Sequence, residues 1–220
     1  MSKINLLEKN ISNIEYQLNK ISLNEIPINK NIKHLGVIPY SFNNDRKLVF
    51  LLGREHYEKC YNASLKFSNF GGSPELDDKS THDGAARECY EESMGFLGTQ
   101  QNIYDSIINS NEVFENDQAI LYPMEIKYDE NMPKLYSDVY NYINKSFDIT
   151  NINNIPEGYF EKIEIRWFTM RDIINNKDIM RPIWFKFFLS IMADSELVIN
   201  NISFSDFDFL MYYGRLKNNY

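Results

Sequence analysis

The chain has 220 residues, of which 43% are apolar and 25% charged, enough to enclose a hydrophobic core and too apolar for a disordered or fibrous protein. Its net charge of −8 leaves no Lys and Arg excess to neutralise a run of phosphates, which argues against general nucleic-acid coating. Two cysteines argue against a disulfide framework, the polar N-terminus lacks a signal peptide, and no apolar run approaches the ~20 residues needed to span a bilayer. We therefore expect a cytoplasmic protein without membrane contact.

Residues 1–33 are predicted to form a helical extension before the main domain. Apolar residues alternate at steps of three and four along it: Ile4, Leu7, Ile11, Ile14, Leu18 and Ile21. Such a seam repeats every 3.5 residues and is typical of a coiled coil. Two interpretations follow, a homodimer through residues 4–21 or a helix that packs on its own domain. Pro27 ends the helical pattern.

Strands and helices then follow in one domain, residues 34–220, with an insertion around residues 130–155. Alternating apolar runs and turn residues predict strands at residues 35–42, 47–53, 65–70, 118–127 and 161–169. Helices are expected at residues 81–94, 133–147 and 183–193, and the last of these is apolar nearly all round and should therefore be buried. Ser80 or Thr81 would cap the first helix and Gly95 would end it. Pro123 places the fourth strand at an edge or a bulge.

The helix at residues 81–94 gathers three carboxylates on one side. At 100° per residue Glu88, Glu91 and Glu92 share a sector about 100° wide. Each like-charge pair costs a helix about 0.2–0.5 kcal/mol, so a compensating charge is expected. Arg87 can pair with Glu91 one turn on, and a hard divalent cation suits the remaining oxygens. The alternative is a solvated acidic helix face.

The context of these acids resembles the Nudix box. Gly71 and Gly72 directly follow a predicted strand, and residues 87–92 (RECYEE) match the second half of the family pattern without a gap. Two departures stand beside the match. The segment from Gly72 to Arg87 is one residue too long, with Asp78 near the place of the loop Glu, and the closing glycine falls one place late, at residue 95.

The resemblance implies an α+β fold, a Nudix-type α/β/α sandwich with a mixed sheet, here with an N-terminal helix added. It implies Mg²⁺- or Mn²⁺-dependent hydrolysis of a phosphoanhydride bond in a nucleoside diphosphate linked to another group. Under it Glu88, Glu91 and Glu92 would hold the ions, Gly72 would contribute a backbone contact and Arg87 would position an acid. The alternative is a weakly catalytic or inactive Nudix-fold module that binds nucleotide or protein.

The choice of substrate stays open at this point. Capped RNA, dinucleoside polyphosphates, nucleotide sugars and inositol pyrophosphates all fit the resemblance, and the differences between them should be sensed by loops at residues 56–63 and 135–154. In the second loop, three tyrosines would either stack on a base or pack the added helix: Tyr136, Tyr140 and Tyr142. Glu75 would either reach the metal or lie exposed. One further acid is expected from among Glu112, Glu115 and Glu125.

Overall fold

The computed structural model describes residues 28–60, 62–110, 112–146, 158–203, 205–207 and 209–211. The predicted heptad helix at residues 4–21, and with it the homodimer, lies outside these residues and stays a prediction. Among the residues described, no helix has the length and apolar character needed to cross a membrane.

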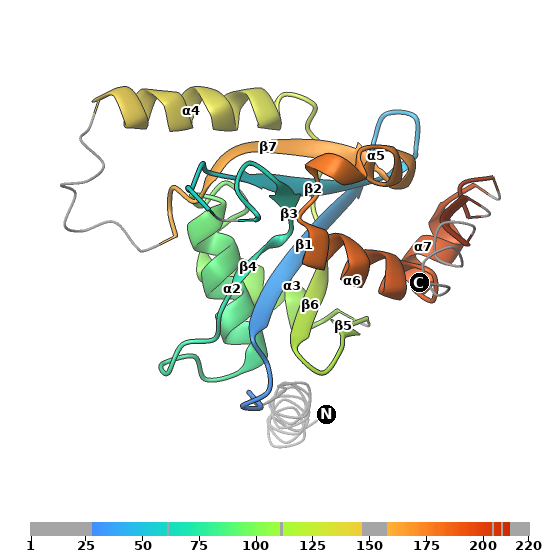
Figure 1. The fold of residues 1–220 in the computed structure, drawn as a ribbon, viewed down its shortest axis with the longest axis horizontal. Coiled ribbons are helices and arrows are strands. Elements are labelled where there is room, and N and C mark those ends of the chain that lie inside the picture. The colour runs from blue at the N-terminus through green and yellow to red at the C-terminus, as the bar shows by residue number, and fades with distance from the viewer. Residues whose placement is uncertain are drawn as a thin grey trace, which may run out of the picture.

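The centre of the molecule is a seven-stranded mixed sheet (Figure 1). Its strands are β1 His34–Phe42, β2 Leu48–Glu55, β3 Phe67–Ser68, β4 Phe70–Gly72, β5 Phe114–Glu115, β6 Ala119–Glu125 and β7 Lys162–Thr169. The main path runs β3-β2-β1-β6-β5, with β4 paired to β1 and β7 paired to β2. β1 runs antiparallel to β2 and parallel to β6, so the sheet combines both pairing types.

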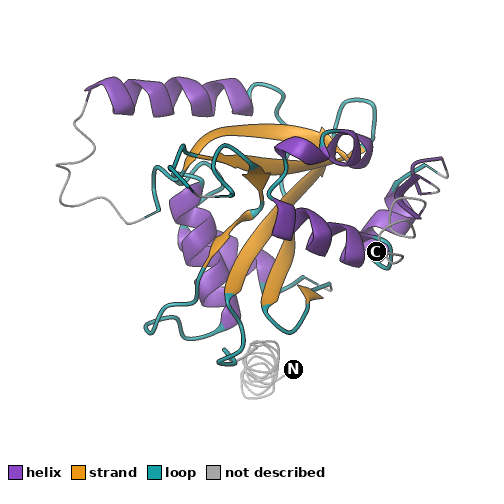
Figure 2. Cartoon of the chain, viewed as in Figure 1, coloured by secondary structure: helices purple, strands orange, loops and turns teal. Residues whose placement is uncertain are grey.

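Helices cover both faces of this sheet (Figure 2). They are α2 Thr81–Glu92, α3 Gln100–Ile107, α4 Met132–Ser146, α5 Met170–Asn175, the 3-10 turn η2 Lys177–Ile179, α6 Pro182–Met192 and α7 Glu196–Asn201. Successive side chains of a strand point to opposite faces. On β2, Leu51 accordingly packs in the cluster that holds Cys89 of α2, whereas Phe50 and Leu52 pack in the cluster that holds Phe188 of α6. The expected α+β sandwich, helix layers on either side of a mixed sheet, is confirmed.

The strand predicted at residues 65–70 is in fact two short strands that meet different partners. β3 pairs with β2, and β4 pairs with β1, on either side of Asn69. The backbones of β1 and β4 approach so closely that a Cβ on Gly71 would lie 2.3 Å from the carbonyl oxygen of Leu35. Glycine is therefore required there by contact, and the switch of partner carries Gly72 to the start of the loop before α2.

The ends of α2 agree with the sequence signals. Ser80 is its N-cap and accepts a hydrogen bond from the backbone N–H of Asp83. Beyond Glu92 the chain turns through two residues with left-handed backbone, Met94 (φ 51°) and Gly95 (φ 72°). Because two successive residues share the reversal, the closing glycine can stand one place later than in the family pattern.

The helices of the described residues differ from expectation in two ways. α3, α5 and α7 were not predicted, although Thr99 forms a capping box with Asn102 at the start of α3. The prediction that α6 is a buried helix fails at its first turn, where Ile183 is 79% exposed. Only one face of α6 packs on the sheet, and its first turn is left to border a cleft.

Candidate functional site

A cleft of about 670 Å³ opens beside the loop that joins β4 to α2. Its residues come mainly from the β4–α2 loop with the acidic side of α2, the segment before β7 and the first turns of α6, and the start of β1, the end of β2 and the turn between β5 and β6 add to them. The side chains used below are Glu75, Arg87, Glu88, Glu91, Glu92, Glu161, Arg181 and Trp184. The cleft thus combines an acidic wall with an aromatic and basic one.

Arg87 lies in the acidic wall and forms ion pairs with four carboxylates. Its guanidinium lies 3.0 Å from Asp78, 3.1 Å from both Glu88 and Glu91, and 3.2 Å from Glu75. The predicted pair with Glu91 is confirmed. Although burial alone would lower it, the pKa of Arg87 is raised by the hydrogen bond to Asp78 and by the surrounding carboxylates. Arg87 therefore stays charged and fixes the acids around it.

Asp78 explains how the longer loop is accommodated. Its side chain is 3% exposed, and its carboxylate accepts hydrogen bonds from the Arg87 guanidinium and from the backbone N–H of Glu75. The loop acid is thus turned inward onto Arg87. Glu75, by contrast, has a 59% exposed side chain and lies at the rim of the cleft, where it also reaches Arg87.

Glu88 and Glu91 face the cleft in tight surroundings. A Cβ on Gly72 would lie 2.5 Å from Oε2 of Glu88, so glycine at this position makes room for the carboxylate against the backbone. Burial raises the pKa of Glu88 to about 7, against the opposing effect of Arg87, and burial also raises the pKa of Glu91. Partly desolvated carboxylates of this kind gain from a nearby cation.

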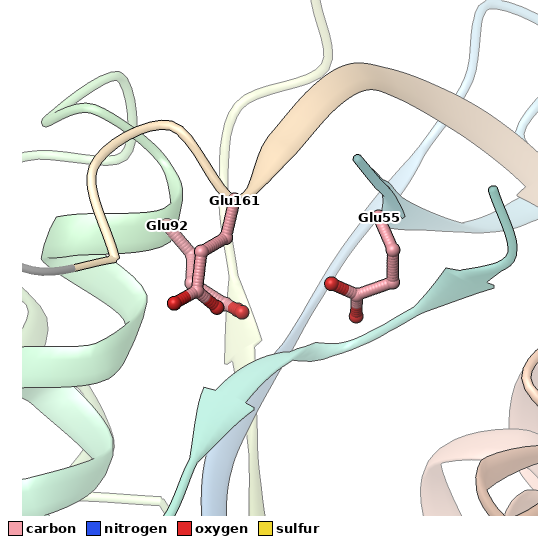
Figure 3. A group of neighbouring side chains, drawn as sticks. All are labelled: Glu55, Glu92 and Glu161. Atoms are coloured by element: carbon pink, nitrogen blue, oxygen red, sulfur yellow. The ribbon is translucent and has the colours of Figure 1, made fainter. Parts of the chain in front are cut away.

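Glu92 has a different setting from its two neighbours. Its Oε2 accepts the backbone N–H of Gly71 at 2.6 Å, and its Oε1 lies 3.0 Å from the ammonium of Lys162. Ligand oxygens of Glu92, Glu55 and Glu161 all lie within 4.8 Å of one another. Figure 3 shows these carboxylates converging from the end of α2, the end of β2 and the residue before β7.

The predicted tyrosines do not line the cleft. Tyr136 is fully buried, and its hydroxyl lies between the backbone carbonyl oxygens of Glu92 at 3.1 Å and Lys162 at 2.9 Å, to which its single hydrogen can donate. The prediction that its ring stacks on substrate is therefore wrong, because the added helix packs it inward. Tyr140 is half-buried against Phe160, and Tyr142 is 68% exposed, and neither is among the cleft residues.

The further acid at the cleft comes from residues that sequence reasoning missed. Glu112 caps α7 by accepting the backbone N–H groups of Glu196 and Leu197, while Glu115 and Glu125 are exposed on strands and are not among the cleft residues. Glu161 and Glu55 lie there instead. The sequence could have indicated them only by their positions, because Glu55 ends β2, Glu161 directly precedes β7, and these two strands pair.

His34, another residue that lines the cleft, makes the stability of the protein depend on pH. Burial and the charge of Arg181 lower the pKa of His34 to about 4, from 6.5. The unfolded chain therefore takes up this proton at higher pH, and the free energy of unfolding falls as pH drops from about 6.5 toward 4. We expect His34→Gln to remove a loss of roughly 2 kcal/mol at pH 5. Urea unfolding of both proteins at pH 8 and pH 5 measures it, and an identical pH dependence would contradict it.

The chain is similar to several solved structures. No family model and no curated protein matches the chain. The Nudix domain of Shewanella oneidensis NrtR, complexed with ADP-ribose, is 9% identical, with 67% of this chain and 79% of that chain covered and a TM-score of 0.38. A Nudix hydrolase from M. smegmatis, RenU, is 9% identical (76% and 90% covered, TM-score 0.44), and a MutT protein from Methanosarcina mazei is 18% identical (73% and 94%, TM-score 0.37).

Proposed function

We propose that this protein is a divalent-metal-dependent hydrolase of the Nudix type that cleaves a phosphoanhydride bond. The observation that carries the proposal is the arrangement around Arg87, which holds Glu88 and Glu91 at one cleft, with Glu88 directly beside Gly72. Residues 87–92 are the part of the sequence that resembles the Nudix box, so motif and geometry support the same chemistry.

The residues present suit Mg²⁺ or Mn²⁺. Glu88 and Glu91 offer hard carboxylate oxygens, and Glu161 lines the same cleft. We propose these three as the residues that hold the metal, with the backbone of Gly72 beside them. When bound, such an ion neutralises phosphate charge and lowers the pKa of its bound water.

The protein's own groups would then orient the reaction. Arg87 holds the two acids of α2 in place, because its planar guanidinium satisfies several carboxylates at fixed angles. The wall of α6, with Ile183, Trp184 and Phe187, is the apolar surface of the cleft on which the non-phosphate part of a nucleotide derivative would lie.

We propose that the reaction takes place in the cytoplasm. The homodimer through residues 4–21 is a separate proposal.

A substrate panel tests the proposal. Purified protein with Mg²⁺ or Mn²⁺ should hydrolyse at least one of capped RNA, dinucleoside polyphosphates, nucleotide sugars such as ADP-ribose, and inositol pyrophosphates, with products identified by chromatography. EDTA should abolish the reaction, because the carboxylates alone repel a phosphate. Undiminished turnover in EDTA would contradict the metal requirement. Tight binding of a panel member without turnover would favour the binding module instead.

A further inference from the structure

A lysine lies among the acids at the inner end of the cleft. Lys162 has no exposed surface, and its ammonium contacts Glu55 at 2.5 Å, Glu92 at 3.0 Å and the hydroxyl of Ser68 at 3.3 Å. An ammonium carries three hydrogens, so these three partners satisfy it completely. Glu55 and Glu92 are two of the three acids whose oxygens converge within 4.8 Å (Figure 3).

The surrounding structure is shaped to hold this ammonium. A Cβ on Gly53 would lie 2.9 Å from the side chain of Lys162, so glycine on β2 leaves space for the lysine stem. A register shift between Arg54 and Glu55 sets Glu55 opposite Lys162 across the β2–β7 pair. The Tyr136 hydroxyl links the strand to α2, because it lies between the carbonyl oxygens of Lys162 and Glu92.

The same contacts occupy both oxygens of Glu92. One pairs with Lys162, the other accepts the N–H of Gly71, and the side chain is 3% exposed. A metal ion placed between Glu55 and Glu92 would take the position of the Lys162 ammonium, and displacing that buried cation would leave a charge without a partner at high cost. Glu161 makes no such pair in the contacts described and faces the cleft.

We propose that Lys162 is a built-in cation that takes the place of a divalent ion between Glu55 and Glu92. Metal in the cleft is then held by Glu88, Glu91 and Glu161. Glu92 is a positioning residue: it fixes Gly71, and through it Gly72, rather than binding metal. This inference rests on the proposed function in one respect, that a metal ion binds in the cleft. The contacts of Lys162 with Glu55 and Glu92 do not depend on hydrolysis.

Replacing the lysine by an uncharged side chain of similar shape tests the proposal with Mn²⁺ alone. In Lys162→Met the freed acids should take up the ion, so the full-length variant should bind one more Mn²⁺ per chain than wild type in equilibrium titration. Saturating Mn²⁺ should also raise its Tm by roughly 5 °C more than it raises that of wild type. Adding Glu92→Gln to this variant should abolish both gains.

Two results would overturn the proposal. One is a Lys162→Met protein that binds no more Mn²⁺ than wild type and gains no extra stability from it. If that variant does not fold with or without Mn²⁺, Glu92→Gln in the wild-type chain decides: an unchanged number of bound Mn²⁺ ions supports the built-in cation, and the loss of one ion refutes it. None of these readouts uses hydrolysis, so failure of the proposed reaction is distinguishable from failure of this inference.

Discussion

Replacing Glu91 by Gln should lower kcat/KM for the hydrolysed substrate by about 100-fold or more, since a lost metal contact removes several kcal/mol of transition-state stabilisation. The amide keeps the shape of the side chain and an acceptor for Arg87, now 3.1 Å away, but not the charge that a divalent ion needs. Stability should be unchanged or slightly higher, because one of three crowded carboxylates is neutralised. Steady-state kinetics at saturating Mg²⁺ and thermal unfolding measure the two effects.

Glu125→Gln is the matched control. Glu125 is exposed at the end of β6 and is not among the cleft residues, yet the substitution removes the same charge. Its kcat/KM should stay near the wild-type value. A Glu91→Gln protein that unfolds, or that hydrolyses substrate as fast as the Glu125→Gln control, would show that Glu91 is structural or dispensable and would refute its proposed role.

Replacing Arg87 by Met should both destabilise the fold and abolish hydrolysis. The arginine side chain is 14% exposed and holds four carboxylates, of which Asp78, Glu88 and Glu91 are themselves at most 16% exposed. Removing one partner of a buried ion pair costs about 3–5 kcal/mol, and the partial exposure of these side chains puts the expected loss at about 3 kcal/mol. Urea unfolding of the metal-free protein measures this loss.

Arg87→Lys separates charge from geometry. A lysine ammonium restores the positive charge but lacks the planar fork that reaches several carboxylates together. We expect it to recover part of the stability and little of the activity. Full recovery of both would mean that charge alone matters, and a fully stable Arg87→Met protein would mean that these ion pairs contribute nothing to the fold.

Local signals in the sequence were sufficient for the helix that carries the acids. Ser80 caps α2, the positions of Glu88 and Glu91 follow from the helical repeat, and Arg87 meets Glu91 because residues four apart are neighbours. The alternation of apolar residues likewise predicted the central strands and the layered α+β class. These features depend on residues within a turn or two of one another, which a single sequence displays directly.

Pairings over long distances decided the rest of the site. Glu55 and Glu161 join the cleft because β2 and β7 pair, and Lys162 meets Glu92 only when α2 packs over that edge of the sheet. Tyr136 turned inward because its hydroxyl found two carbonyls from different elements. The sequence by itself thus determined the α2 acids and their arginine, whereas the tertiary structure decided which of those acids is open to a metal, because charge and access at Glu92 are set by a residue seventy positions away.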